Sequence, residues 1–189
     1  MAIKTFNSGE VLTASDTNTY LANGGLVFVK QTTTTSGTTA DVTSCFSATY
    51  NAYRLVVSDL RTAATAAFHF TVLSGTTVAA SNWTFQSGRL DYATNAWNLQ
   101  KGTASANVDN VGVASTNSVG LTIDIFNPYL SQNTSVMAQG TDARGTTGYP
   151  VMITNGLLSN TTSYDGLRLT LASSTYSNAV LTVYGYRLG

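Results

Sequence analysis

Charged side chains are scarce in this chain of 189 residues, where Asp, Glu, Lys and Arg make up 10% of the sequence against about 25% in typical soluble domains. The nine basic residues balance the nine acidic ones, and the basic residues stand singly rather than in clusters. A groove for DNA or RNA needs clustered Lys and Arg to neutralise phosphates. The sequence therefore predicts no nucleic-acid partner.

Side chains that carry catalysis are scarce as well, since the chain has one cysteine (Cys45), one histidine (His69) and one glutamate (Glu10). One cysteine excludes an internal disulfide, and one His with one Cys is too few for a zinc site. A nucleophilic triad needs a base beside the nucleophile, but His69 alternates with Phe68 and Phe70 and is expected to be an outward or hydrogen-bonded strand residue. The remaining carboxylates are dispersed aspartates, which do not suggest the paired acids of glycoside hydrolysis. We expect no enzymatic activity, no metal and no cofactor.

Long hydrophobic runs are absent from the sequence. No apolar stretch approaches the roughly 20 residues needed to cross a bilayer, and the residues after Lys4 are polar, unlike the apolar centre of a signal peptide. The sequence predicts synthesis in a cytoplasm without membrane insertion. A protein of this kind that acts at an outer surface would reach it without the usual export signal, for example on release from a lysing host cell.

Small polar residues take the place of charge: 32 Thr, 19 Ser and 15 Asn make up about 35% of the chain. From residue 26 onward, apolar and polar residues alternate with the period of two that is typical of strands with one buried face. We expect an all-β, jelly-roll-like β-sandwich, with a closed barrel as the alternative. The predicted strands are 26–32, 40–46, 53–59, 67–73, 83–91, 119–127, 134–139, 151–155, 166–172 and 179–187.

Two segments interrupt this alternation. Residues 31–40 contain a Thr-rich run followed by Gly37, and we expect a hinge there. Residues 94–116 have no clear strand pattern, and we expect a long surface loop. The dipeptides Ser87-Gly88 and Asn155-Gly156 are favourable turn sequences, so we expect turns at both.

The first 25 residues have a different character from the remainder. Thr13 can cap a helix whose third residue is Asp16, and residues 23–25, Asn-Gly-Gly, can end it. This spacing predicts a short helical turn. Five apolar side chains are too many for so small an element to bury alone, so we expect them to pack on the body of the protein or on a partner. They are Phe6, Val11, Leu12, Tyr20 and Leu21.

The segment 3–26 resembles the N-terminal leader of small virion proteins of tailed bacteriophages, a family of tail fibre and minor structural proteins. Residues 46–58, 126–129 and 179–187 are similar to parts of the β-sandwich that follows this leader in such proteins. A departure occurs in 67–75, where His69 and Thr71 stand in place of arginine. The resemblance implies a virion-attachment arm and hinge at 1–35 and a β-sandwich domain at 36–189.

The resemblance also implies a function and partners. The chain is expected to be a virion structural protein, a small tail fibre or baseplate-attached adhesin that docks on other phage proteins through Phe6, Val11, Leu12, Tyr20 and Leu21. Capsid decoration is the alternative, and an enzyme acting on surface polysaccharide is the third reading, disfavoured because its acid and base are missing. Phage proteins of this kind are commonly trimers, and the scarcity of surface charge also favours a symmetric oligomer, with a homotrimer as the expected state.

Aromatic residues in the middle of the chain suggest a second kind of contact. Trp83, Tyr92 and Trp97 lie in or beside the segment 83–116, where flat rings next to Asn and Asp side chains could stack on the sugars of a host glycan. Core packing is the competing interpretation, because a large aromatic at a strand position is usually buried. Both interpretations stay open at this point.

Overall fold

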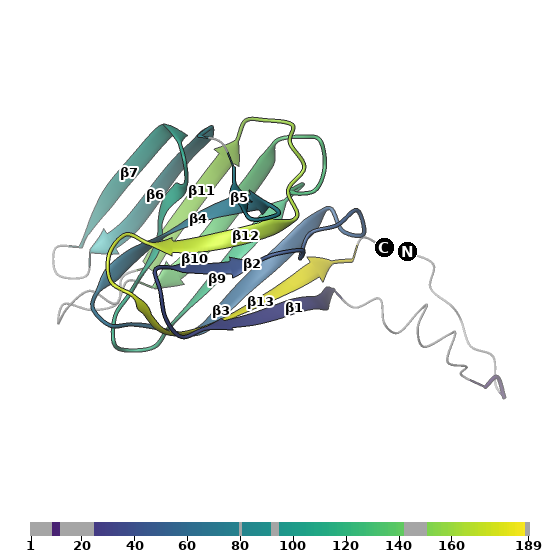
Figure 1. Ribbon diagram of the computed structural model, residues 1–189, viewed down its shortest axis with the longest axis horizontal. Helices are drawn as coiled ribbons and strands as arrows, with labels where there is room; N and C mark the ends of the chain where they lie inside the picture. The colour runs from purple at the N-terminus through teal and green to yellow at the C-terminus, as the bar shows by residue number, and fades with distance from the viewer. Residues whose placement is uncertain (1–8, 12–24, 80, 92–94, 142–150, 188–189) are drawn as a thin grey trace.

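The structure is a computed structural model that describes residues 9–11, 25–79, 81–91, 95–141 and 151–187. These residues form thirteen β-strands and no helix (Figure 1). In chain order the strands are β1 (Leu26–Thr34), β2 (Thr39–Val42), β3 (Ala52–Thr62), β4 (Ala66–Ser74), β5 (Thr77–Val78), β6 (Trp83–Asp91), β7 (Ala96–Ser105), β8 (Val108–Ala114), β9 (Val119–Phe126), β10 (Thr134–Thr141), β11 (Val151–Leu158), β12 (Gly166–Leu171) and β13 (Tyr176–Tyr186).

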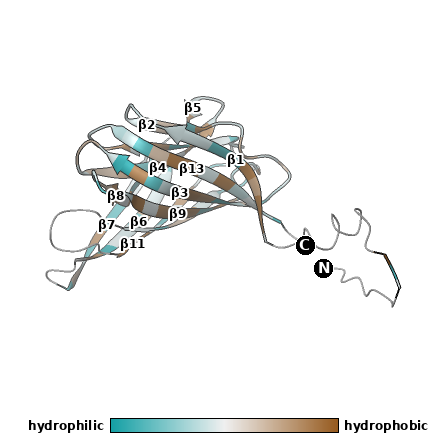
Figure 2. Ribbon diagram, turned by 90° about the horizontal axis from the view of Figure 1, so that it is seen from below, coloured by the Kyte–Doolittle hydropathy of each residue, from teal (hydrophilic) through white to brown (hydrophobic). Residues whose placement is uncertain are grey.

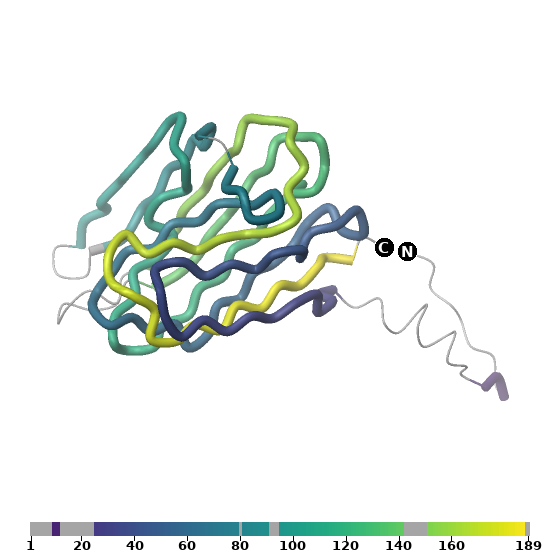
Figure 3. Tube along the Cα trace, viewed as in Figure 1, coloured from purple at the N-terminus to yellow at the C-terminus, as the bar shows by residue number. Residues whose placement is uncertain are grey.

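The strands form two antiparallel sheets that face each other. The large sheet has the order β1-β13-β3-β9-β10-β11-β6-β7, and the small sheet has the order β2-β12-β4-β5, with β8 also paired to β4. Figure 3 shows that the first and last strands, β1 in purple and β13 in yellow, lie side by side. The all-β sandwich expected from the alternation is confirmed.

The chain moves between the two sheets in the order of a jelly roll. From β2 in the small sheet it passes to β3 in the large one, then to β4, to β6 and β7, to β8, to β9 and finally to β12. The jelly-roll strand that lies between β3 and β6 is expanded here into a three-stranded meander, β9-β10-β11. Among the described strands, β1 and β7 have no further partner at the edges of the large sheet, so the fold is an open sandwich and not a closed barrel.

The core lies between the sheets and is built from the inward residues of both. Brown stretches in Figure 2 mark the hydrophobic residues along central strands such as β3 and β9. Tyr53, Leu55, Phe68, Phe70 and Trp83 are among the largest fully buried side chains. Cys45 is also buried, as a small hydrophobic residue would be, and burial raises the pKa of its thiol to about 12.

The prediction of a surface loop at 94–116 is wrong, because this segment contains β7 and β8. Strand β7 is the edge strand of the large sheet, and almost all of its residues are exposed on both faces, so no apolar alternation marks it. Strand β8 is irregular, because Asn110 has a positive φ of 53° and the pairing with β4 shifts register between Phe68 and Phe70. Both strands lack the signal that identified the others.

The hinge expected at 31–40, and with it the end of the arm at residue 35, is also corrected. Residues 26–34 pair with β13 along their length and belong to the sandwich. The chain then turns at Gly37, whose φ is 79°, and enters β2 at once. The Thr-rich run is a strand because β-branched side chains suit the pleated edge of a sheet.

Two expected turns lie inside strands. Gly88 is in β6, and Gly156 is in β11, where a Cβ atom would come within 2.5 Å of the Val108 side chain. These glycines allow close packing and do not change the chain direction.

The helical turn expected in the leader lies outside the described residues, as do Phe6, Leu12, Tyr20 and Leu21. Val11 is described, and it is 78% exposed. The described part of the sandwich therefore does not bury this side chain.

Candidate functional site

The outer face of β10, β11, β6 and β7 is rich in exposed apolar side chains. We call this surface the apolar face and define it by seven residues on these four strands. Six of them are exposed, Trp97, Leu99, Met137, Val151, Ile153 and Leu157, and Leu90 is half-buried.

Strand register explains why these side chains gather. In β11, Val151, Ile153 and Leu157 point outward, while Met152, Thr154 and Leu158 are buried. Across the strands, Ile153 stands opposite Gly88, which in turn stands opposite Leu99. Because pairing residues share a face, the apolar side chains of three strands form one surface.

Trp97 lies on this face and covers Gly88. A Cβ atom at Gly88 would lie 3.2 Å from the Trp97 ring and 3.3 Å from Leu99, so the glycine makes room for both side chains. Trp97 remains 54% exposed and Leu99 70% exposed. The ring is therefore held on the sheet with much of its surface open to solvent.

A polar cluster lies beside the apolar face, on β3, β9 and β13. The Arg54 guanidinium donates two hydrogen bonds to Asp124, Nε to Oδ1 at 2.7 Å and Nη2 to Oδ2 at 2.6 Å. The Tyr186 hydroxyl donates to the same Oδ1 at 2.6 Å, and Arg54 lies over the Tyr186 ring, 5.5 Å from its centroid. Three side chains from three strands are thereby fixed on one face.

These contacts shift the pKa values of the acidic partners. Burial alone would raise the pKa of Asp124, but the hydrogen bonds from Arg54 and Tyr186 outweigh it and lower the pKa below its ordinary value. Burial and the hydrogen bond to Asp124 raise the pKa of Tyr186 to about 12. At neutral pH the carboxylate is therefore charged and the phenol is neutral.

The outer face of the small sheet has the opposite character. Arg168 on β12 makes a bidentate pair with Asp41 on β2, at 2.7 and 2.6 Å. On β4, His69 Nδ1 lies 2.9 Å from Asp109 Oδ1, although no hydrogen bond forms at this buried nitrogen. This face is thus lined by charged and polar groups, and the exposed apolar residues collect on the large sheet.

Of the residues predicted for glycan contact, the structure describes Trp83 and Trp97, and these two differ in exposure. Trp83 is fully buried, and its indole Nε1 donates to Thr71 Oγ1 at 3.3 Å, so core packing describes it and it is removed from the surface candidates. Trp97 is exposed, and Tyr92 lies outside the described residues. Of the three rings, Trp97 is the one that the structure places at the surface.

Several titratable groups of the described residues make structural contacts. Asp165 accepts a hydrogen bond from the Gly75 amide at 2.8 Å, which is the turn role expected of a loop aspartate. Within these residues no group of three or more His, Cys, Asp and Glu side chains is placed to hold a metal. In the part of the chain that the structure describes, no helix has the length and apolar character needed to cross a membrane.

The apolar face was not predicted from the sequence. A signal for it exists in β11, where Val151, Met152 and Ile153 are consecutive and Leu157 is followed by Leu158, so that both faces of the strand carry apolar residues. Such a run is also typical of a strand buried on both sides. Only the sheet order shows that no described strand covers one side of β11.

Comparison with known proteins does not identify the chain, because no family model and no curated protein matches it.

Proposed function

We propose that this chain is a structural protein of a tailed-bacteriophage virion, a small tail fibre or baseplate-attached adhesin that docks through its N-terminal segment and presents the sandwich outward. The resemblance of residues 3–26 to phage leaders motivates the proposal. The 78% exposure of Val11 agrees with it, because an apolar attachment residue must be available to a partner.

The observation that carries the proposal is the apolar face. Monomeric proteins rarely expose large contiguous apolar surface, and such patches usually mark an interface. Here Trp97, Leu99 and Met137 are each more than half exposed on one side of the sandwich, while the other side is polar. This arrangement suits a component of an assembly better than a free monomer.

A second copy of the same chain is the proposed occupant of the apolar face. The formal net charge is zero, and the charges beside this face are an internal pair, Arg54 with Asp124, and Lys101 on β7. Two such faces can therefore approach each other without strong repulsion. The resemblance to phage fibre proteins suggests three copies, with a possible host glycan as an outer ligand.

We propose no catalytic role for this chain. Asp41, Asp59 and Asp124 are each held by an arginine, which supports structural roles for these carboxylates. The chain is proposed to work by binding and by spacing other parts of the particle.

The test is to label tailed particles of the virus that encodes the chain with antibodies raised against residues 25–187. Label on the tail or baseplate is the expected result. Label on the head would replace the fibre with the alternative, capsid decoration. Absence of the chain from purified particles, by labelling and by mass spectrometry, would overturn both.

A deletion of residues 1–24 tests the attachment step. It stops before Leu26 because β1 is part of the large sheet. We expect the shortened chain to keep its strand content by circular dichroism and to be missing from particles when it replaces the full chain during infection. Incorporation at the full-length level would contradict attachment through the leader.

A further inference from the structure

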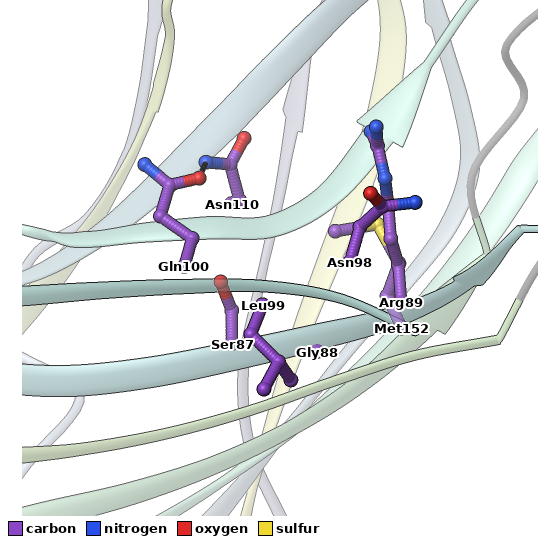
Figure 4. A pocket seen from close by; sticks show the side chains of 8 residues that line it. All are labelled: Ser87, Gly88, Arg89, Asn98, Leu99, Gln100, Asn110 and Met152. Atoms are coloured by element: carbon purple, nitrogen blue, oxygen red, sulfur yellow. Dashed lines mark hydrogen bonds between the residues drawn. The ribbon is translucent and has the colours of Figure 1, made fainter. Parts of the chain in front are cut away.

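A polar pocket of about 310 Å³ lies on the inner side of β6 and β7, where the small sheet covers the large one incompletely. Figure 4 shows its lining: the Gln100 and Asn110 carboxamides point toward each other, and Asn98 lies beside Arg89 and Met152. The side chains come from four strands, β6, β7, β8 and β11. We call this space the inter-sheet pocket.

The inner face of the sandwich changes from apolar to polar at this place. Along β6, the inward residues Trp83 and Phe85 belong to the core, but the next two inward residues are Ser87 and Arg89. In β7 and β8 the inward positions near them are occupied by Asn98, Gln100 and Asn110. Asn98 and Gln100 are exposed, so this part of the inner face is open to solvent.

The pairing of β6 with β11 and β7 determines which side chains form the floor of the pocket. Ser87 stands opposite Thr154 on one side and Gln100 on the other, and Arg89 stands opposite Met152 and Asn98 in the same way. Ser87 and Met152 are buried, while Asn98 and Gln100 are exposed at the mouth. The floor is thus two short rows of side chains with an open end.

Asn110 forms the opposite wall and is held in place from two sides. Its backbone carbonyl accepts a hydrogen bond from Thr154 Oγ1 at 3.0 Å, and its carboxamide nitrogen donates to Gln100 Oε1. Its φ of 53° is a left-handed conformation, which asparagine adopts more readily than most residues other than glycine. The wall of the pocket is therefore preorganised.

From this geometry we propose that the inter-sheet pocket binds one or two pyranose rings of a hydroxyl-rich saccharide. A carboxamide donates and accepts hydrogen bonds, as a sugar hydroxyl does, so Asn98, Gln100 and Asn110 can each pair with ring hydroxyls. The Met152 side chain offers an apolar contact for the carbon face of a ring. The volume lies at the small end of the range for ligand pockets, roughly 300 Å³, which suits one or two rings and not a longer chain.

The pocket is distinct from the Trp97 surface. Asn98 and Trp97 are neighbours in β7, so they point to opposite faces of the sheet, and Trp97 packs on the outer side of Gly88. The proposed ligand is therefore held by carboxamides and not by the aromatic ring that the sequence suggested. This inference does not depend on the virion role, because sugar binding and particle attachment involve different residues.

Ligand-observed saturation-transfer NMR on the full chain tests the proposal. The probes are methyl glycosides of neutral hexoses, N-acetylhexosamines and hexuronates, each titrated into the millimolar range. Binding of at least one class is expected. Binding of the hexuronates alone also supports the proposal; no transfer to any of the three classes overturns it.

Two variants and one control locate the binding. Asn110→Gly removes the carboxamide and relieves the positive φ, and Asn98→Ala removes a group at the mouth; each should weaken the affinity roughly tenfold. Asn155→Ala removes an exposed carboxamide from the outer face of β11 and should leave it unchanged. Equal affinity in all four proteins would overturn the assignment to this pocket.

Discussion

At the scale of single residues, Arg54, Asp124 and Tyr186 show how a protein with few charges uses them. The three groups bond to one another on the outer face of the large sheet, so that both charges there have a partner of opposite charge. The two shifted pKa values make this arrangement measurable, because a group whose pKa differs between the folded and unfolded states makes stability depend on pH.

The raised pKa of Tyr186 predicts that the folded protein loses stability in alkali. Its pKa is about 12 in the folded protein against 10 for an ordinary tyrosine, so its contribution is complete below pH 10 and is lost as the pH rises toward 12. Tyr186→Phe should therefore flatten the fall in the free energy of unfolding over this interval, measured by urea denaturation at several pH values. The buried groups Tyr53, Tyr176 and Cys45, whose pKa values are also raised, keep a remainder of the fall. An identical slope in variant and wild type would contradict the predicted role.

The lowered pKa of Asp124 predicts that the folded protein loses stability in acid. Its lowered pKa means that its contribution is present above the ordinary value near 4 and is lost as the pH falls through the folded-state value. Asp124→Asn should cost about 1 kcal/mol at pH 7, because the pair is partly exposed, and the difference should close on acidification. Urea denaturation at pH 7 and pH 3 measures it. A difference that stays constant with pH would show that the ion pair does not stabilise the fold.

At the scale of elements, glycines inside strands make room for the side chains of neighbouring strands. Gly112 in β8 faces the buried Phe68 ring, and a Cβ atom there would lie 2.1 Å from it, whereas a Cβ atom at Gly120 in β9 would meet only the Val57 carbonyl at 3.7 Å. Gly112→Ala should lower the free energy of unfolding by about 1–3 kcal/mol, and Gly120→Ala should change it much less. Thermal unfolding of both variants is the measurement, and equal midpoints would contradict the account.

The sequence predicted strands correctly where a strand has one buried face. The alternation of Leu167, Leu169 and Leu171 with polar residues predicted β12, which lies between β2 and β4 in the small sheet. The same reasoning missed β7, because an edge strand exposed on both faces needs no alternation. It also assigned Gly88 and Gly156 to turns, since sequence does not show that a side chain from a neighbouring strand occupies the space of the missing Cβ.

The candidate sites were less accessible to prediction than the fold. The apolar face depends on the order of the meander β9-β10-β11 beside β6, and the inter-sheet pocket depends on which sheet covers which strand. Asn98 and Asn110 are twelve residues apart, and nothing in the sequence between them indicates that they share a cavity. Trp97, by contrast, was recognised as a surface candidate from its residue type and neighbours.

At the scale of the whole molecule, the two outer surfaces differ, and the difference suggests how copies of the chain meet. Ile153 lies in the middle of the apolar face, so Ile153→Lys should place a charge in the contact between copies and shift the protein toward monomers in sedimentation experiments. Thr39→Lys, on the polar small sheet, is the matched control and should not change the sedimentation. Dissociation in the control alone would move the interface to the other sheet.

The molar mass of the full chain in solution, measured by light scattering during size-exclusion chromatography at micromolar concentration, tests the central claim that the apolar face is covered by other copies. The account predicts about 60 kDa, three times the 19.9 kDa of one chain. A mass of one chain at every concentration tested would contradict it.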